Sequence, residues 1–572
     1  MIGIKYDNEY LDVFPNIELS FELVNQVFST GDVSVLPGSF SFPFDIPATP
    51  LNRRILNFPD RVDNAEPFFR EGEVEVLYNH IMLFRGTMKV TSTTDVTIKI
   101  YIVANPMTSL KNKYLTDLSL GGPRTWVGDF LDHMLATANT PENYDYVFFP
   151  IWNEDQNDYE EDDDPLNYQN FFDYTTGEFV EASGALTPFV KLEYLLEQIF
   201  QEEETGYHFK NQFQPANDLE MRRLYVYNNV DCRTATLTTA PVTPDELILS
   251  NHLPKEKTTD FLKKVAAQWC LGFFSNVFDK TVKLIPLQTL LQRPPADDWT
   301  EHAIRGIEIQ ENEQAPDGFN YSQPEDIPPG IPEPTDLEVL NTTADYTAEL
   351  SGLTAGYYYI ESQARIVEIK VFSGTPTGVR SWLRHRGVFF GNANPLQVGM
   401  QAFFSILAGG MDVYRPLTKV SRWHAVVDIT TTYEYRTEDC PVGLMFYRGM
   451  QEQYSGDDPT PLACNHVWLA THTGGDRSDI TISAVSQAQS QRSLNWFGDY
   501  GLYNTAHRIW NEMLRNGKRV TMSFRLPLST LLAFNFEQKI RVGNQDYFVK
   551  RLKVSITPRG LAPVEAELFT VI

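Results

Sequence analysis

The segment from Thr258 to Ile285, TTDFLKKVAAQWCLGFFSNVFDKTVKLI, constrains the fold of this chain more than any other stretch. Four of its apolar residues recur at the spacing of one helix face, namely Phe261, Leu262, Val265 and Trp269. Thr258 or Thr259 is suited to cap the start of this helix, and Gly272 is suited to end it. The segment therefore predicts a short amphipathic helix that packs against a core.

A tight β-hairpin is expected directly after this helix. Residues 273–278 and 281–285 form two runs rich in apolar residues on either side of Asp279-Lys280. Aromatic and β-branched residues of this kind favour strands. Because the whole unit carries no catalytic group, it directs attention to assembly rather than to a reaction.

Composition bounds both the architecture and the partners. With 572 residues the chain should hold more than one domain, and its 42% apolar and 13% aromatic content is ample for β-rich cores. It has 47 Lys and Arg against 75 Asp and Glu, a formal net charge of −28. Such a chain should not bind nucleic acid, because phosphate binding needs Lys and Arg to replace counterions. We expect no membrane insertion, since no run of about 18 apolar residues and no signal-peptide core occurs.

Motifs for catalysis, metals and cofactors give weak signals. The sequence has no GxSxG, HExxH, Walker A or GxGxxG motif in a suitable context, so we predict no enzyme activity and no cofactor. The four cysteines lack the short spacings of a disulfide framework or a zinc knuckle. Cys464, His466 and His472 are close in sequence but lack paired ligand spacing. The acidic run 154–164 does not match a calcium loop and is better interpreted as a solvated loop.

The first hundred residues are predicted to form short antiparallel strands. Apolar residues alternate with polar or small ones, as on a half-buried strand, at Phe40, Phe42, Phe44 and Ile46. Pro43 and Pro47 favour an edge position or an entering arm for this stretch. Asn79-His80 is suited to a hairpin turn between two apolar runs, and residues 96–102 again alternate.

Helices are predicted at two further places. In residues 187–206, Thr187 is suited to the N-cap, Pro188 to the first helical position and Gly206 to the end. A helix ending at Gly517 is followed by strands that include a Gly543-Asn544 turn.

These patterns predict a mainly β (α+β) chain of tandem small antiparallel β-barrels with packed helices, plus an inserted β-sandwich-like domain. The parts we expect are an N-terminal β-barrel domain at 1–110, a second domain at 111–320 with helices at 188–204 and 259–270, a Pro-rich linker or arm at 321–338, an inserted β-rich domain at 339–490 and a C-terminal α+β segment at 491–572.

The helix–hairpin unit resembles the segment of phage tail and baseplate hub proteins in which a helix packs beside a barrel. This family includes late control proteins and tail-associated hub proteins of long-tailed phages. Three further stretches look like the variant found in phages and prophages of the Bacteroidota, namely residues 42–62, 192–209 and 493–556. The resemblance spans most of residues 15–320 and 490–572, whereas residues 340–490 have no clear match in the family.

The resemblance implies a structural virion protein of the tail tip or baseplate, made in the host cytoplasm. It would form a homo-oligomeric ring of tandem barrels, a trimer or a hexamer. The ring would contact the tail tube or distal-tail protein on one side and a spike, fibre or tape-measure protein on the other. DNA would pass through its channel during genome ejection without specific binding. We expect acidic side chains to gather at the channel, because they repel phosphate.

Extended, rigid stretches are candidate subunit contacts, because they lose little entropy on docking. The residues concerned are Phe40, Phe42, Phe44, Pro324, Pro328, Pro329, Pro332 and Pro334. Packing within the chain is an equal alternative for them. A second interpretation makes residues 340–490 a receptor- or glycan-binding module, with Trp382 and Trp423 as sugar contacts. A third and less favoured interpretation is a cell-wall or glycan hydrolase, which would need two converging carboxylates.

Overall fold

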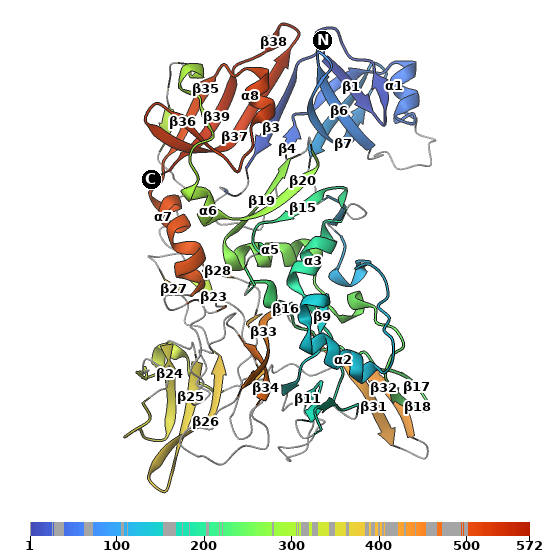
Figure 1. Cartoon of the computed structure of the whole chain (residues 1–572). Coiled ribbons are helices and arrows are strands. Elements are labelled where there is room, and N and C mark those ends of the chain that lie inside the picture. The colour runs from blue at the N-terminus through green and yellow to red at the C-terminus, as the bar shows by residue number, and fades with distance from the viewer. Residues whose placement is uncertain are drawn as a thin grey trace.

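The computed structural model describes most of the chain. The described residues are 2–25, 27, 39–61, 72–104, 108–110, 112–152, 168–173, 176–181, 184–201, 205–216, 218–219, 221–276, 279–304, 306, 308–310, 320–322, 330–341, 349–361, 365–383, 388–389, 395–397, 401–402, 405–406, 421–427, 431–440, 442–452, 466–471, 494, 496 and 501–571. Fifteen of the described strands form one sheet, which we call the upper sheet, and a second core lies below it in Figure 1.

The upper sheet joins the two ends of the chain. Its N-terminal strands are β1 (Ile2–Tyr6), β2 (Glu9–Leu11), β3 (Leu19–Val24), β4 (Ser39–Ser41), β5 (Phe44–Pro47), β6 (Gly72–Tyr78), β7 (Ile81–Thr93) and β8 (Thr97–Ala104). Its later strands are β21 (Asp297–Asp298), β22 (Glu308–Gln310), β35 (Arg519–Phe524), β36 (Lys539–Val542), β37 (Gln545–Thr557), β38 (Gly560–Leu561) and β39 (Val564–Thr570). The main path runs β2-β1-β6-β7-β8-β4-β3-β37-β39-β35-β22. Antiparallel pairing of β3 with β37, from Leu19↔Ile556 to Val24↔Arg551, therefore closes the N-terminal strands onto the C-terminal ones.

Local sequence explains the N-terminal strands well. The isoleucines on one face of β8 are fully buried, namely Ile98, Ile100 and Ile102. Val96, which we expected on the same face, precedes the strand and is 69% exposed. Asn79 and His80 have φ of 49° and 67°, the pair of positive values that a tight hairpin turn needs. The predicted turn between β6 and β7 is therefore confirmed.

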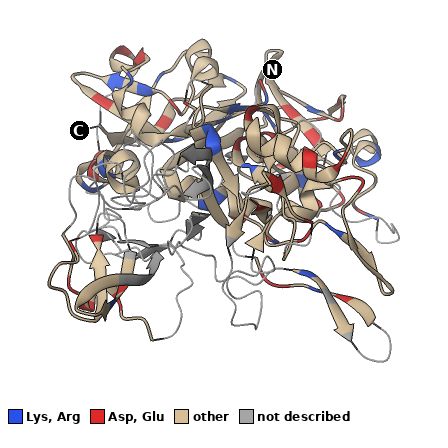
Figure 2. Ribbon diagram, turned by 60° about the horizontal axis from the view of Figure 1, so that its bottom comes forward, with Lys and Arg blue, Asp and Glu red and all other residues tan. Residues whose placement is uncertain are grey.

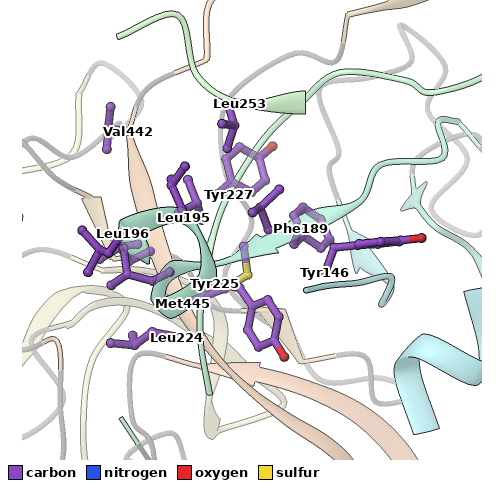
Figure 3. Packing of buried hydrophobic residues seen from close by; sticks show 14 of the residues in the cluster. Tyr146, Phe189, Leu195, Leu196, Leu224, Tyr225, Tyr227, Leu253, Val442 and Met445 are labelled. Carbon is purple, nitrogen blue, oxygen red and sulfur yellow. The ribbon is translucent and has the colours of Figure 1, made fainter. Parts of the chain in front are cut away.

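The second core, which we call the lower core, is built from helices and a sheet in which most strands are short. Its helices are α2 (Phe130–Asn139), α3 (Leu192–Ile199) and α5 (Thr258–Trp269). Its sheet contains β9 (Tyr146–Val147), β14 (Phe189–Lys191), β16 (Leu224–Val226), β29 (Gln401–Ala402), β30 (Ser405–Ile406), β33 (Gly443–Glu452) and β34 (His466–Thr471). All three residues of β14 and of β16 are buried. Figure 3 shows Phe189, Tyr225 and Met445, from three neighbouring strands, in one packed layer with the α3 leucines.

The start and end predicted for α3 are wrong. Thr187 does not cap a helix, because the Asn170 side chain holds it: its N–H donates to Asn170 Oδ1 at 2.7 Å. The next residues form strand β14, and the helix begins only at Leu192 after Lys191. The helix ends at Ile199, well before Gly206. Strand pairing from distant parts of the chain has overridden the local capping signal.

The helix and hairpin predicted around Thr258 are confirmed. Helix α5 begins at Thr258, although Lys257 rather than a threonine occupies the N-cap. It ends at Trp269, and the C-cap residue is Cys270, whose φ of 52° is left-handed, so Gly272 is not the stop. Two antiparallel strands follow, β19 (Leu271–Asn276) and β20 (Thr281–Pro286), and β15 (His208–Asn211) adds to β20 in parallel.

The remaining described elements are short. The helices are α1 (Pro50–Ile55), α6 (Leu287–Gln292), α7 (Arg508–Asn516) and α8 (Leu528–Ala533). The strands are β10 (Ile151–Trp152), β11 (Tyr168–Gln169), β12 (Phe172–Asp173), β13 (Glu178–Phe179), β17 (Thr234–Thr236), β18 (Thr239–Val242), β23 (Asn320–Ser322), β24 (Gly356–Ile360), β25 (Arg365–Phe372), β26 (Thr375–Leu383), β27 (Val388–Phe389), β28 (Pro395–Gln397), β31 (Arg422–Val427) and β32 (Thr431–Arg436). The predicted mainly β (α+β) class is confirmed.

Strand pairing crosses two of the predicted domain boundaries. In the lower core, β16 pairs with β33, which belongs to the part expected to be an inserted domain. In the upper sheet, the segment expected to be C-terminal completes a sheet begun by the first hundred residues. The domain division itself stays a prediction.

Candidate functional site

The helix–hairpin unit, residues 258–286, lies between the upper sheet and the lower core, and it is the candidate functional element. The inward residues of α5 predicted from the sequence are all buried, namely Phe261, Leu262, Val265 and Trp269. They pack into the lower core together with α3 and the lower sheet. In Figure 1 the hairpin β19–β20 rises from this core toward the upper sheet.

The opposite side of the unit packs into a small separate core, which we call the seam. Its buried residues are Cys270, Phe274, Ile285, Leu287, Leu290, Trp510, Met513, Phe548 and Phe569. They come from the hairpin, from helices α6 and α7, and from strands β37 and β39 of the upper sheet. The seam therefore fixes the hairpin against the C-terminal part of the upper sheet by apolar contacts.

Gly272 serves close packing in the seam. A Cβ at this position would lie 2.6 Å from Leu287 Cδ2, 2.7 Å from Phe274 Cε2 and 3.0 Å from Val27 Cγ2. Because Leu287 and Phe274 are themselves buried, they have little room to move aside. The glycine that seemed to stop a helix thus allows the hairpin to lie close to its neighbours.

Ion pairs reinforce both contacts of the hairpin with the upper sheet. Lys283 of β20 lies 2.5 Å from Glu537, and Lys280 in the turn lies 3.4 Å from Glu73 of β6. Glu73 also accepts a hydrogen bond from Arg85 at 2.5 Å. This bond from Arg85 lowers the pKa of Glu73, and the charge of Lys280 acts in the same direction. The hairpin is thus tied to the N-terminal and the C-terminal parts of the sheet at once.

His507 is a buried residue of this region that the sequence analysis did not single out. It ends a π-helical turn, Tyr503–His507, which leads into α7. Its Nε2 lies 3.1 Å from the backbone oxygen of Gln268 in α5, and its ring packs beside Trp496. Burial lowers the pKa of His507 to about 4, so the ring is neutral at pH 7. No local pattern distinguishes this histidine, because its partner lies 239 positions away.

A buried amide network in the lower core was also missed. Asn170 is fully buried with φ of 55°, and its Nδ2 donates to the backbone oxygens of Phe149 at 3.0 Å and Thr187 at 2.8 Å. Gln169 beside it donates to Asn228 O at 3.3 Å and accepts from the Tyr227 hydroxyl at 3.1 Å. These bonds satisfy backbone groups that short, irregular strands leave without ladder partners.

The predicted contact residues fall in different environments. Phe42 is 37% exposed, and Lys553 Nζ lies 5.8 Å from its ring centre. Phe44 packs partly against the upper-sheet core, and Pro334 is buried while Pro332 is half-buried. For Phe40 only the backbone, in β4, is described. Three of the predicted contacts lie outside the described residues, namely Pro324, Pro328 and Pro329.

Of the two predicted glycan contacts, only Trp423 has a described side chain. Trp423 is half-buried: its Nε1–H donates to Arg233 O at 3.3 Å, and its ring meets Tyr435 edge-on at 5.3 Å. The Trp382 side chain lies outside the described part of the chain, although its backbone belongs to β26.

The side chains behind the weak metal signals lie outside the described residues. Among the described residues, no group of three or more His, Cys, Asp or Glu side chains is placed to hold a metal ion. The acidic run 154–164, Cys464 and His472 lie outside those residues, and for His466 only the backbone of β34 is described. No helix in the described ranges has the length and apolar character needed to span a membrane.

Positions of Lys and Arg and positions of Asp and Glu are both spread along the described ribbon (Figure 2). Several carboxylates are held by cations: Glu567, on β39, contacts Arg519 at 2.5 Å, Lys550 at 2.9 Å and Arg551 at 3.3 Å. Burial acts to raise the pKa of Glu567, but the hydrogen bonds and charges of Lys550 and Arg519 outweigh it and lower the pKa. Such carboxylates are structural rather than poised for proton transfer.

No protein-family model and no curated protein matches this chain. Three solved structures are similar along nearly their whole length. The 43 kDa tail protein of prophage MuSo2 from Shewanella oneidensis is 8% identical, with 100% of this chain and 97% of that one covered at a TM-score of 0.33. A tail protein from Neisseria meningitidis MC58 is 8% identical, with coverages of 99% and 95% and a TM-score of 0.31. Prophage tail protein gp18 from Listeria monocytogenes EGD-e is 7% identical, with coverages of 99% and 94% and a TM-score of 0.32. Scores this low do not establish a common fold.

Proposed function

We propose that this chain is a structural protein of a phage tail and forms part of the hub at the tail tip or baseplate. The observation that carries the proposal is the position of the helix–hairpin unit. The segment whose sequence resembles tail-hub proteins is the element that contacts the lower core, the seam and the upper sheet together. A segment with this position determines how the two parts of the chain are held, as a hub subunit requires.

The proposed mode of action is rigid assembly without catalysis or a cofactor. Two of the least exposed described carboxylates are engaged in ion pairs, Glu537 with Lys283 and Asp231 with Arg233 at 2.7 Å. A carboxylate whose oxygens are held by neighbouring cations is less available to protonate a leaving group or to attack a substrate. We therefore expect no hydrolysis of peptidoglycan or of host surface polysaccharide by the purified protein.

The proposed partners follow from the hub role. Copies of the chain would form a ring, either a trimer or a hexamer. One side would bind the tail tube or distal-tail protein, and the other a spike, fibre or tape-measure protein. DNA would pass through without specific binding, which suits a subunit of net charge −28. A channel lined by basic or uncharged residues in the assembled ring would contradict this part of the proposal.

A test begins with particles from a strain that carries the gene. Mass spectrometry of purified particles should detect the chain in tail-containing fractions, and gold-labelled antibody should mark the tail end distal to the head. Antibody against a head protein on the same grids provides the matched control. Absence of the chain from particles, or label on the head or along the tail shaft, would overturn the proposal.

A glycan-binding role is the second candidate, but no described feature favours it. The half-buried ring of Trp423 contacts Tyr435 and Arg233, which removes it as an open stacking surface. Binding of host polysaccharide that is lost on changing Trp382 would restore this candidate.

A further inference from the structure

Two hairpins project together from the lower part of the molecule, and we call them the arm. The first is β17–β18, residues 234–242, and the second is β31–β32, residues 422–436. They lie side by side in Figure 1 and extend clear of the body in Figure 2. The backbone N–H of Tyr433 donates to Leu237 O at 3.0 Å, which links the second hairpin to the tip of the first.

The base of the arm is held firmly. Arg233 forms a buried ion pair with Asp231 and also donates to the backbone oxygens of Glu181 at 2.9 Å and Gly184 at 3.1 Å. The backbone oxygen of Ser421 accepts a hydrogen bond from the backbone N–H of Asp231 at 3.0 Å and another from the hydroxyl of Tyr435 at 3.1 Å. The bases of both hairpins are therefore held together around Asp231 and Ser421. A projection held this way loses little conformational entropy when it docks.

The outer part of the first hairpin is exposed and carries no charge. Residues 234–243, TATLTTAPVT, contain no Asp, Glu, Lys or Arg, whereas charged residues make up 21% of the chain. Leu237 is 70% exposed and Val242 54% exposed, and Val426 on the second hairpin is 37% exposed. Uncharged, β-prone, projecting strands invite association with another chain unless they are covered, and natural proteins usually protect such edges with charge.

The chemistry of the arm restricts its partner. A nucleic acid would need basic side chains, and residues 234–243 contain none. A glycan would need an exposed aromatic ring, but the rings of Trp423, Tyr433 and Tyr435 are all half-buried. The exposed side chains of the first hairpin are Thr, Ala, Val and Leu, which favour a protein surface, whereas the second hairpin also exposes Glu434 and Arg436.

We propose that the arm is a contact between neighbouring copies of this chain. The argument for a second copy rests on charge. Two molecules of net charge −28 repel each other over most of their surfaces, so self-association is least opposed where the surface is neutral and apolar. The first hairpin of the arm offers such a surface on a rigid support. The biological role of this contact rests on the proposed ring of subunits. Self-association, however, is a property of the purified chain, so it is tested separately from the location of the chain in phage particles.

The test is sedimentation velocity of the full-length chain over a wide range of concentration, with the double variant Leu237→Asp and Val242→Asp beside it. The wild type should associate as concentration rises, and the variant should raise the dissociation constant about 100-fold, because burying two carboxylates opposes the contact. Leu219→Asp is the matched control, since Leu219 is 64% exposed and lies outside the arm. It should leave the dissociation constant unchanged.

Urea unfolding of each variant checks the fold, and its midpoint should stay at the wild-type value because all three side chains are exposed. A wild type that stays monomeric at every concentration would overturn the proposal. Association that the arm variant leaves intact, or that Leu219→Asp weakens equally, would also overturn it. A chain that associates through the arm yet is missing from phage particles would refute the proposed function and leave the arm contact standing.

Discussion

In the upper sheet, strands from opposite ends of the chain are joined by ladder hydrogen bonds and by polar side chains near the surface. Ser20 and Ser555, which are 535 positions apart, face each other at 2.7 Å between their hydroxyls, and Arg551 reaches Glu22 at 3.4 Å. In the lower core, distant segments are joined by buried side-chain amides such as Asn170, which form hydrogen bonds with backbone groups of irregular segments. The upper sheet should therefore tolerate single polar changes, whereas the lower core should not.

The largest expected effect is in the lower core. Asn170→Ala should lower the free energy of unfolding by about 4 kcal/mol, because it leaves three buried backbone groups without partners and places alanine at positive φ. Urea unfolding measures the change. Asn139→Ala, at the exposed end of α2, should change stability by less than about 0.5 kcal/mol. Similar values for the two variants would show that the buried amide of Asn170 contributes no more to stability than an exposed one.

The second-largest effect is the loss of stability in acid, when His507, which joins α5 to the π-helical turn before α7, becomes protonated. The pKa of His507 is about 4 in the fold and about 6.5 when unfolded, so the unfolded chain binds the extra proton between these values. Stability should be full above pH 6.5 and fall as the pH drops toward 4.

Each unit of pKa difference changes the free energy of unfolding by about 1.4 kcal/mol. Between pH 6.5 and 4 the variant His507→Gln should therefore lose about 3 kcal/mol less stability than the wild type. Thermal or urea unfolding at several pH values measures it. His208→Gln, at an exposed position in β15, is the control and should keep the wild-type pH profile. An unchanged profile in His507→Gln would show that protonation of this ring does not weaken the fold.

A smaller effect is expected at the seam. Gly272→Ala should cost about 2 kcal/mol, because the added methyl group would press on Leu287 and Phe274. Hydrogen exchange should rise in peptides from β19, α6 and α7 before it rises in the rest of the upper sheet. Gly356→Ala is the control, since the nearest atom to its Cβ is 3.9 Å away. An equal loss of hydrogen-exchange protection throughout the upper sheet would mean that the seam does not open independently of the sheet.

The smallest effect is expected in the upper sheet. Glu567→Gln should cost about 1 kcal/mol at pH 7 and low salt, because the three cations around it stay partly hydrated. Its pKa is lowered in the fold, so the stabilisation is present above the unfolded pKa of about 4.3 and disappears as the pH falls through the folded value. The exposed neighbour Glu565→Gln is the control. A cost as large as that of Asn170→Ala would remove the difference between the two regions.

The same contrast explains what the sequence predicts. In the upper sheet, the alternation in β8 and the Asn79-His80 turn are local signals, and both predictions hold. In the lower core, Thr187 has every local feature of a helix cap, but Asn170 holds it beside a strand. At the candidate site, the α5 residues were predictable from helical spacing, whereas His507 and the arm were not. Their contacts depend on segments hundreds of positions apart, or on another molecule.

The central claim is that the helix–hairpin unit holds the upper sheet and lower core together in a subunit of the tail hub. Electron cryomicroscopy of the isolated tail end tests it most directly. The account predicts a ring of copies at the tip, with the seam intact in each copy and the arms touching neighbouring copies. A tail tip that lacks this chain, or one in which the upper sheet and lower core are separated at the hairpin, would contradict it.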